Sequence, residues 1–329
     1  MADFTTIGWG ILGAGSIANR LAEGVLALPD AKLMAVGSRD QAKADAFADK
    51  YGIPNRYAGY DALVNDPKVD VIYVATPHPF HKEHSLLALN AGKHVLCEKP
   101  FTINEGEARE VVDFAKSKRL FIMEAMWTRF FPLMGTVRKL LKAGEIGTPY
   151  LLHADFGFKG SFNPEGRLYN PNLGGGALLD VGVYPISFAS MVLGEPERVT
   201  GLATLGQTGV DEVSGMVFSY GNGALSLLST SVRVNTAQTA VIMGTEGKIS
   251  MHAPWWKPDT MTVSRSGKED EVINLPYSSS GFNYEVEEVG DCLRSGKLES
   301  DIIPLDESLA IMRTMDTLRA QWGLKYPME

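Results

Sequence analysis

Cysteine is scarce in this sequence, and so are long apolar runs. Cys97 and Cys292 are the only two cysteines among 329 residues, so they cannot cross-link a chain of this length, and we expect two reduced, buried thiols. Residues 1–6 lack the basic region of a signal peptide, and no apolar run approaches the roughly 20 residues of a membrane span. These absences predict a cytoplasmic protein with no membrane partner.

An excess of positive charge is also missing. The chain has 31 Lys and Arg against 39 Asp and Glu, a formal net charge of −8. Proteins that bind nucleic acid need a dominant basic face, so no nucleic-acid partner is expected. The hydrophobic share of 45% is that of an ordinary globular protein, and the length allows two domains. No metal site is predicted.

Strand and helix signals alternate through the first third of the chain. Strands are expected at 7–12, 32–36, 56–57, 69–75, 94–97 and 120–123. Helices are expected at 17–28, 41–50, 60–64, 80–90 and 104–118, the second capped by Asp40 and the last by Asn104. Strands separated by helices predict an α/β fold with a parallel, doubly wound sheet.

The second half of the chain has a different pattern. A helix at 132–142 is followed by crowded turn signals from 144 to 176 and a helix at 179–193. Alternating segments at 199–205, 213–220, 224–232, 237–243, 248–251, 261–263 and 271–275 predict a large, mostly antiparallel open sheet, and helices at 284–293 and 305–321 close the chain. We therefore expect domains at 1–125 and 126–329, with the last helix free to pack back on the first domain.

A glycine-rich turn follows the first predicted strand and opens a helix. Gly13 permits the tight turn, Gly15 lets the backbone approach a pyrophosphate, and Ala18 permits close packing of the helix on the strand. The N–H groups at the start of that helix would face the phosphates. The turn predicts a dinucleotide site that includes Gly13, Ala14, Gly15, Ser16 and Ile17.

The end of the second strand predicts which nicotinamide cofactor binds. An acidic residue there would bond the ribose of NAD, whereas an arginine accommodates the 2′-phosphate of NADP. Ser38 is small and uncharged, Arg39 is placed for a phosphate, and Lys43 adds charge one turn into the helix. Asp40 argues for NAD, but its position fits a helix cap. NADP(H) is therefore predicted, with NAD(H) as the second candidate.

The end of the fourth strand should also line the cofactor. Thr76 and Pro77 end that strand, and His81 stands at the start of the next helix. His81 could contact the cofactor or be catalytic, although a structural hydrogen bond at a helix end is the simpler role. Glu98, Trp127 and Arg129 complete the predicted cofactor set, and a surface salt bridge is the alternative for Arg129.

Lys99 indicates where chemistry could occur. It stands in Glu98-Lys99-Pro100, directly after the predicted strand at 94–97. Ligands of open α/β sheets bind in the crevice beyond the carboxyl ends of the strands, so Lys99 should project near a bound nicotinamide. A glycine-rich turn together with such a lysine favours an oxidoreductase over a simple nucleotide binder.

The motifs resemble those of the glucose–fructose oxidoreductase, inositol dehydrogenase and rhizopine-catabolism family. The resemblance rests on Gly13-Ala14-Gly15, Thr76-Pro77, Glu98-Lys99-Pro100 and the segment 174–184 (Gly-Gly-Gly-Ala-Leu-Leu-Asp-Val-Gly-Val-Tyr), and covers nearly the whole chain. It implies an N-terminal Rossmann domain, a C-terminal α/β domain whose open sheet makes a homodimer interface, and a Lys-Pro peptide that is often cis.

One departure from the family pattern is informative. Many members have histidine where this sequence has Tyr184. Together with residues 124–130 (Glu-Ala-Met-Trp-Thr-Arg-Phe), this is similar to the branch of dimeric dihydrodiol dehydrogenases and NADP-dependent D-xylose 1-dehydrogenases. The departure argues against inositol dehydrogenase activity.

Asp180, Tyr184 and Lys99 are the predicted catalytic residues. Asp180 and Tyr184 are four residues apart, so a helix would place them on one face. Oxidation of an alcohol needs a base at its hydroxyl, and a nearby cation favours the ionised form of a phenol. We assign Tyr184 as proton acceptor, Lys99 as the cation that also holds the substrate oxygen, and Asp180 as the group that orients Lys99 or a second hydroxyl. Lys99 as the base is the alternative.

Aromatic side chains are expected to shape the substrate pocket, because sugar faces and apolar diols both pack on aromatic rings. The candidates are Trp127, Phe156, Phe158, Trp255, Trp256 and Phe282, and those assigned to substrate with Asp180 and Tyr184 are Trp127, Phe156, Trp255 and Phe282. The predicted function is hydride transfer between NADP(H) and a hydroxyl of a sugar or cyclic diol. The alternatives are a physiological reductase of a sugar-like carbonyl and a catalytically silent dinucleotide sensor of the same fold.

Overall fold

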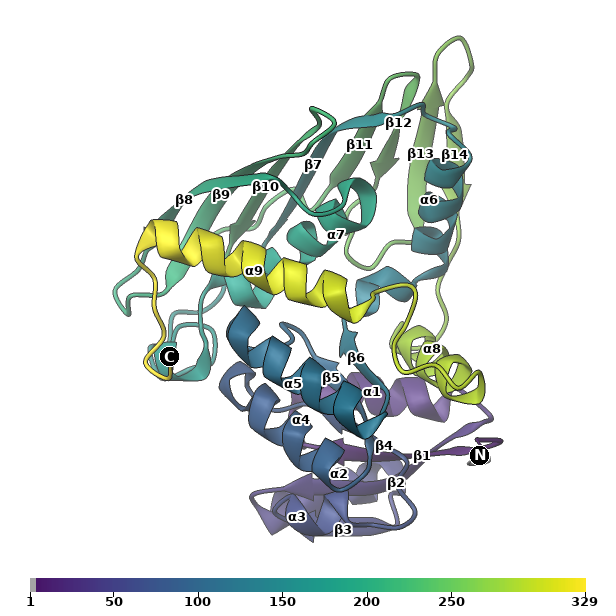
Figure 1. Ribbon diagram of the computed structural model, residues 1–329, viewed down its shortest axis with the longest axis vertical. Helices are drawn as coiled ribbons and strands as arrows, with labels where there is room; N and C mark the ends of the chain where they lie inside the picture. The colour runs from purple at the N-terminus through teal and green to yellow at the C-terminus, as the bar shows by residue number, and fades with distance from the viewer. Residues whose placement is uncertain (1–3) are drawn as a thin grey trace. The chain divides into compact units, whose positions relative to one another are not determined.

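The structure is a computed structural model that describes residues 4–329 (Figure 1). The expectation of no signal peptide at residues 1–6 falls in part on residues 1–3, which lie outside the described residues. The chain divides into two compact units. The first contains the chain up to Trp127 together with Ser278–Ser308, and the second contains Thr128–Tyr277 and Leu309–Glu329.

The first unit is built on a parallel sheet. In the described residues this sheet has six strands in the order β3-β2-β1-β4-β5-β6, and every neighbouring pair is parallel. The strands are β1 (Ile7–Leu12), β2 (Ala31–Ser38), β3 (Asn55–Ala58), β4 (Val71–Val74), β5 (His94–Glu98) and β6 (Ile122–Ala125). The strand order reverses between β1 and β4, where doubly wound sheets bind dinucleotides. The predicted fold class is confirmed for this unit.

Helices connect these strands as predicted, with ends shifted by a few residues. They are α1 (Ser16–Leu26), α2 (Gln41–Tyr51), α3 (Asp61–Val64), α4 (His81–Asn90) and α5 (Glu105–Lys118). Asp40 caps α2 by accepting the Ala42 N–H at 2.9 Å, and Asn104 caps α5 by accepting the Glu107 N–H at 2.9 Å. Both predicted caps are confirmed, so the starts of these helices follow from local sequence.

A helix from late in the chain completes the first unit. Helix α8 (Asn283–Arg294) packs on α1 so closely that a Cβ on Gly24 would come within 2.7 Å of the Asn283 nitrogen. Arg294 also pairs with Asp30 at 2.7 Å. The sequence-based division placed all of residues 126–329 in the second domain. The structure instead places residues 278–308 with the first unit. The sequence did not reveal this, because the contacts join segments that are far apart in the chain and no local pattern records them.

The second unit is built on a larger sheet. Its described residues form eight strands in the order β14-β13-β12-β11-β7-β10-β9-β8, and only the β7–β10 pair is parallel. The strands are β7 (Pro149–Gly157), β8 (Arg198–Leu205), β9 (Asp211–Ser219), β10 (Leu225–Ser231), β11 (Ala240–Gly244), β12 (Gly247–Met251), β13 (Thr260–Arg265) and β14 (Glu271–Asn274). The predicted mostly antiparallel sheet is confirmed.

Strand β7 was not predicted. It lies in the middle of the sheet between β10 and β11, in a region read from sequence as turns. Its first residue is proline and its last is glycine, and both are typical of turns. The apolar–polar alternation between them is too short to stand out as a strand. The sheet therefore forms around a strand that the sequence analysis did not predict.

Three helices belong to the second unit: α6 (Pro132–Lys142), α7 (Val183–Leu193) and most of α9 (Leu305–Trp322). Figure 1 shows α7 against the sheet, and it contacts β7 and β10. In the described residues, the helical stretch Pro171–Leu193 is long and apolar enough to cross a membrane, and 78% of its most apolar window is buried inside the structure. The expectation that no stretch approaches that length was wrong, and the burial is that of a core helix.

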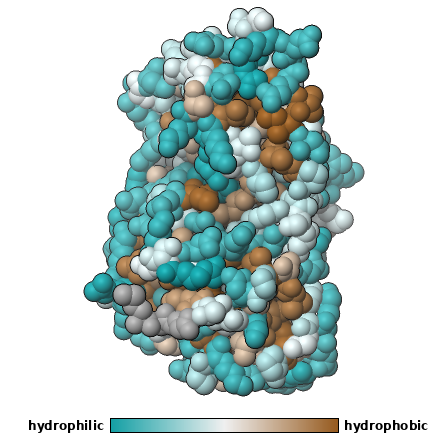
Figure 2. Space-filling model, turned by 90° about the vertical axis from the view of Figure 1, so that its right-hand side faces the viewer, coloured by the Kyte–Doolittle hydropathy of each residue, from teal (hydrophilic) through white to brown (hydrophobic). Residues whose placement is uncertain are grey.

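One face of the large sheet carries exposed apolar side chains. Leu227 and Val217 are opposite each other on β10 and β9, and each is 41% exposed. Leu202, on the neighbouring strand β8, is 84% exposed. Elsewhere hydrophobic patches lie within a mainly hydrophilic surface, as the view in Figure 2 shows. Cys97 and Cys292 are buried free thiols, as expected.

Candidate active site

The glycine turn after β1 has the shape that a dinucleotide requires. Gly13 has φ +107°, a conformation that side chains rarely adopt, and a Cβ there would lie 3.1 Å from the Ala75 oxygen. A Cβ on Gly15 would meet only that same oxygen, at 3.9 Å. Ala14, Gly15 and Ser16 are at least partly exposed, so open space faces the start of α1. A phosphate can therefore approach the backbone N–H groups of this helix end.

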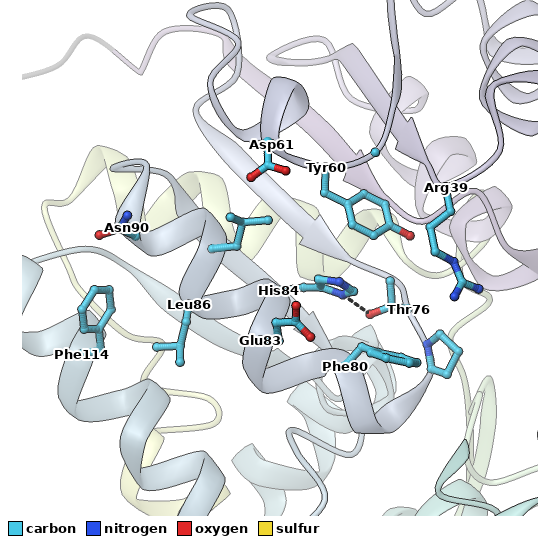
Figure 3. Close-up of a pocket in the computed structure, with 13 residues that line it drawn as sticks. Arg39, Tyr60, Asp61, Thr76, Phe80, Glu83, His84, Leu86, Asn90 and Phe114 are labelled. Carbon is cyan, nitrogen blue, oxygen red and sulfur yellow. Dashed lines mark hydrogen bonds between the residues drawn. The ribbon is translucent and has the colours of Figure 1, made fainter. Parts of the chain in front are cut away.

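A cavity of about 760 Å³ opens at the ends of β2 and β4, and none of residues 13–17 lines it, although Thr76, which does, lies next to Gly13. Arg39 lines one side and Thr76 with Pro77 another, as predicted. Figure 3 shows the Tyr60 hydroxyl on the side of Arg39 and the His84 ring beside Thr76. The further lining residues are Gly59, Asp61, Phe80, Glu83, Leu86, Leu87, Asn90 and Phe114.

Sequence reasoning missed Tyr60, Phe80 and His84. The His84 ring packs edge-on to Tyr60, with centroids 4.7 Å apart, and stacks on Phe80 at 5.8 Å. Thr76 Oγ1 lies 2.9 Å from His84 Nδ1. Burial, followed by the nearby charge of Arg39, lowers the pKa of His84 to about 4. The cavity thus combines flat neutral rings with one guanidinium, which suits an adenosine that carries a phosphate.

The turn after β2 is arranged around Arg39. Asp40 is engaged as the cap of α2, and Ser38 Oγ accepts the Asp40 N–H at 3.3 Å. Ser38 is buried and supports the turn, whereas Arg39 is exposed into the cavity. Lys43 is exposed on α2 but does not line the cavity. Arg39 is thus the one Lys or Arg side chain among the residues that line the cavity, which Asp61 and Glu83 also line.

His81 does not face the cofactor cavity. Its side chain is fully buried, with Nδ1 2.8 Å from the Pro100 oxygen and Nε2 2.8 Å from the Thr76 oxygen. The ring therefore ties the loop after β4 to the loop after β5. Its predicted cofactor contact is corrected to the structural role that was the alternative.

Lys99 follows β5, as the sequence predicted. Its side chain is half-buried, and the Lys99–Pro100 peptide is cis, as the resemblance implied. Glu98 is buried, and the Tyr73 hydroxyl donates a hydrogen bond to its Oε1. The Lys99 N–H donates to Glu98 Oε2 at 3.2 Å. Glu98 thus fixes the backbone that carries Lys99, a more specific role than the cofactor contact predicted for it.

Trp127 and Phe282 form a pair in the first unit. Their rings are stacked with centroids 4.6 Å apart, and both side chains are buried. Phe282 directly precedes α8 and Trp127 follows β6, so the pair joins two segments that are distant in the sequence.

In the second unit, Asp180 and Tyr184 lie on consecutive helical turns. Asp180 is in a π-helical turn, Leu178–Gly182, and Tyr184 is in the first turn of α7. Such π turns are rare and often occur at functional sites. Arg167 grips Asp180 with two contacts, Nη1 to Oδ1 at 2.8 Å and Nη2 to Oδ2 at 3.3 Å. Sequence reasoning missed Arg167.

Tyr184 belongs to an aromatic cluster with Phe156 and Trp256. The Phe156 ring stacks on Trp256 at 4.8 Å and meets Tyr184 edge-on at 5.1 Å. Phe156 is thus beside Tyr184, as predicted. Trp255 is not: it is fully buried against Phe188 at 4.9 Å and donates its indole N–H to the Asp155 oxygen at 2.6 Å. Its predicted substrate contact is corrected to core packing, whereas its neighbour Trp256 lies in the cluster with Phe156 and Tyr184.

Arg129 is buried in the second unit rather than exposed. Its Nη1 donates to the backbone oxygen and the Oγ of Ser187, at 3.1 and 3.2 Å. The alternative of a surface salt bridge is therefore wrong. In residues 4–329, no group of three or more His, Cys, Asp or Glu side chains is placed to hold a metal ion.

Comparison with known proteins identifies the family. A family model described as "Oxidoreductase family, NAD-binding Rossmann fold" matches residues 7–126, and a "GFO/IDH/MocA C-terminal domain" model matches residues 134–250. The chain belongs to the GFO/IDH/MocA oxidoreductase family, as the motifs indicated. The Rossmann unit with Lys99 at a strand end is thus the cofactor domain of an oxidoreductase.

Relatives of known activity match along the full length. Trans-1,2-dihydrobenzene-1,2-diol dehydrogenase of Mus musculus is 38% identical over 330 residues, covering 98% of each chain. D-xylose 1-dehydrogenase (NADP(+)) of Hypocrea jecorina is 35% identical and covers 98% of this chain and 93% of its own. Among solved structures, KijD10, a 3-ketoreductase from Actinomadura kijaniata in complex with NADP and TDP-benzene, has a TM-score of 0.85 at 26% identity, covering 96% and 97% of the two chains.

Proposed function

We propose that this protein is an NADP(H)-dependent oxidoreductase that transfers hydride between the nicotinamide and a hydroxyl of a sugar or cyclic diol. The observation that carries the proposal is Lys99, set at the carboxyl end of β5 in a Rossmann unit whose glycine turn leaves room for a pyrophosphate. The diol and D-xylose dehydrogenases among the relatives support the substrate class.

Arg39 supports NADP(H) as the cofactor. It is exposed at one side of the cavity, while Asp40, the acidic residue that could bond an unphosphorylated ribose, is engaged as a helix cap. A guanidinium binds phosphate with charge-assisted hydrogen bonds, so Arg39 would add affinity for the 2′-phosphate that only NADP(H) carries. NADP(H) is therefore favoured over NAD(H).

The catalytic roles follow from the chemistry of an alcohol. NADP⁺, when bound, supplies the hydride acceptor. Tyr184 takes the hydroxyl proton, Lys99 holds the alcohol oxygen and favours the ionised phenol, and Asp180 orients a second hydroxyl. Arg167 supports Asp180, because two contacts fix the carboxylate in one orientation. In the reverse direction Tyr184 returns the proton to a carbonyl oxygen.

The aromatic cluster of Phe156, Tyr184 and Trp256 favours a substrate with an apolar face. Sugar rings and cyclic diols both present carbon-bound hydrogens that pack on aromatic rings. The Arg167 hydrogen bonds hold the Asp180 carboxylate one helical turn before Tyr184, a member of this cluster. The carboxylate can accept a hydrogen bond from a substrate hydroxyl.

The proposal includes a homodimer and a cytoplasmic location. The exposed apolar side chains on β8, β9 and β10 would be covered by the same face of a second copy, as in isologous dimers. The free, buried thiols of Cys97 and Cys292 suit a reducing compartment.

The test compares Lys99→Met with Lys268→Met, a change of an exposed lysine in the turn after β13. Lys99→Met should reduce kcat for the substrate dehydrogenation by about 10²–10⁴-fold and leave NADPH affinity within about twofold. Lys268→Met should change neither. Normal turnover by the Lys99→Met variant would contradict the proposed mechanism.

A further inference from the structure

The backbone that leads into the Asp180–Tyr184 turn is held from outside by a buried carboxyl. Asp211, the first residue of β9, is fully buried, and its Oδ2 accepts the Leu178 N–H at 2.7 Å. A Cβ on Gly176 would come within 2.3 Å of Asp211 Oδ1. The glycine therefore allows the carboxyl to approach the backbone directly.

A second buried group holds the preceding peptide. The Tyr326 hydroxyl donates to the Gly175 oxygen at 2.7 Å, and its ring is 1% exposed. The Arg319 guanidinium lies 5.2 Å from the centre of that ring. Glu329 accepts two hydrogen bonds from Arg319, at 2.7 and 2.9 Å, and one from the Tyr326 N–H at 2.9 Å. Tyr326 is thus held at its hydroxyl by the Gly175 oxygen and at its backbone N–H by Glu329.

The loop before the turn also contributes, since the Gly175 and Gly176 N–H groups bond the Asn170 and Leu168 oxygens at 3.0 and 2.9 Å. Gly176 has φ +116°, and the Asp180 N–H reaches the Gly176 oxygen only at 3.4 Å. The π-helical turn that follows, Leu178–Gly182, departs from the regular helical ladder. The orientation of Asp180 and Tyr184 therefore depends on where residues 175–178 are fixed.

We propose that Asp211 and Tyr326 are positioning residues, which hold residues 175–178 so that Asp180 and Tyr184 are oriented for the reaction. This inference rests on the proposed function. Neither side chain needs to touch substrate, because each acts through the backbone of the turn. A displacement of about 1 Å at a catalytic group is enough to lower turnover by about 10²-fold.

The position of Asp211 also implies a pH dependence. Burial raises the pKa of Asp211 to about 7, although the backbone N–H groups of Leu178, Asp211 and Ala177 and the charge of Arg319 oppose this. The titratable groups that face Asp211 are Arg319 from α9 and Tyr326. Glu329 faces Arg319 and Tyr326. Protonation weakens the carboxyl as an acceptor, so the local bond to the Leu178 N–H should weaken as the pH falls below about 7, although the raised pKa makes the folded state as a whole less stable as the pH rises toward 7.

The experiment compares Tyr326→Phe and Asp211→Asn with Tyr220→Phe. Tyr220 is a buried tyrosine of the same unit whose hydroxyl lies 3.2 Å from Ser226 Oγ, away from the turn. Hydrogen exchange of residues 176–184 should be about tenfold faster in the first two variants and unchanged in the control, since Tyr326→Phe loses the bond to the Gly175 oxygen and Asp211→Asn replaces a charged acceptor with a weaker amide acceptor. In the same two variants kcat should fall about tenfold with NADPH affinity unchanged.

The pH profile separates positioning from mere stability. For the wild type and Tyr326→Phe, kcat should fall as the pH drops below about 7, whereas Asp211→Asn should lack that limb because the titrating group is gone. Exchange and kcat within twofold of wild type in both variants would overturn the proposal, as would faster exchange with unchanged kcat and pH profile. If Asp211→Asn does not fold, the proposal is tested by Tyr326→Phe alone, through its hydrogen exchange at residues 176–184 and its kcat.

Failure of the proposed function gives a different result. The wild type would then transfer no hydride to or from any substrate tested, while the exchange comparison would still report whether Asp211 and Tyr326 fix the turn. An inactive wild type would overturn the proposed reaction and the catalytic part of this inference. Faster exchange in its variants would then show only that Asp211 and Tyr326 fix the turn.

Discussion

Glu285→Gln should stabilise the protein increasingly as the pH rises. Glu285 lies on α8, is fully buried, and neither of its carboxyl oxygens has a hydrogen-bond partner among residues 4–329. Burial, followed by the nearby charge of Glu98, raises the pKa of Glu285 well above its ordinary value of 4.5. The side chain therefore keeps its proton in the folded protein at pH values where the unfolded chain has lost it.

The sign and size follow from proton linkage. For a carboxyl whose folded pKa is raised, the stabilisation is complete below the unfolded pKa and is lost as the pH rises, at about 1.4 kcal/mol per pH unit until the folded pKa is reached. Glutamine has the same shape and no proton to retain. At pH values between the unfolded and the folded pKa, the variant should therefore gain stability relative to wild type with each rise in pH, and the gain should level off once the folded pKa is passed.

The assay is urea unfolding at several pH values, followed by circular dichroism and tryptophan fluorescence. Glu287→Gln is the matched control, because Glu287 is exposed on the same helix, and a much smaller slope is expected. A Glu285→Gln difference that stays flat with pH, or a variant less stable than wild type at pH 7.5, would refute the reasoning. Either result would mean that Glu285 is ionised and partnered in the folded protein.

Three further predictions concern the cofactor, the dimer and the catalytic turn. Arg39→Ala should weaken NADP⁺ binding about 10–100-fold in calorimetry and leave NAD⁺ unchanged, and equal losses for both would contradict its role. Leu227→Asp should convert a dimer to a monomer in light scattering, whereas Val272→Asp, on β14 and 63% exposed, should not. Gly176→Ala should lower Tm by several degrees, because its Cβ would come within 2.3 Å of Asp211 at φ +116°, and an unchanged Tm would argue against that geometry.

Local patterns predicted the elements that carry their own signals. The Gly13–Gly15 turn, the Asp40 cap and the strand before Lys99 are all defined by a few consecutive residues, and the structure has each of them. The cofactor end of the first unit could therefore be located from sequence.

The rest of the cavity could not be predicted in this way. Tyr60 precedes α3, and His84 is in α4, yet both rings meet beside Arg39. Their meeting depends on the order of the strands, which places β4 next to β1 rather than next to β3. No spacing within either segment records that order.

Adjacent aromatic residues show a second limit. Trp255 and Trp256 are equivalent by composition, but Trp255 enters the core and Trp256 stacks on Phe156. The Ala253–Pro254 peptide before them is cis and no periodic pattern surrounds them. Arg167 was missed for a related reason: it stands in an irregular loop, where exposure and partners are set by tertiary contacts.

The most direct test of the central claim is a cofactor and substrate panel with the wild-type protein. Purified protein is mixed with NADP⁺ or NAD⁺ and with D-xylose, D-glucose, myo-inositol or a trans-dihydrodiol, and reduced nicotinamide is followed by absorbance. We predict turnover with a pentose or the diol, and a higher kcat/KM with NADP⁺ than with NAD⁺. Tight NADPH binding without hydride transfer in either direction would contradict the account and indicate a dinucleotide sensor.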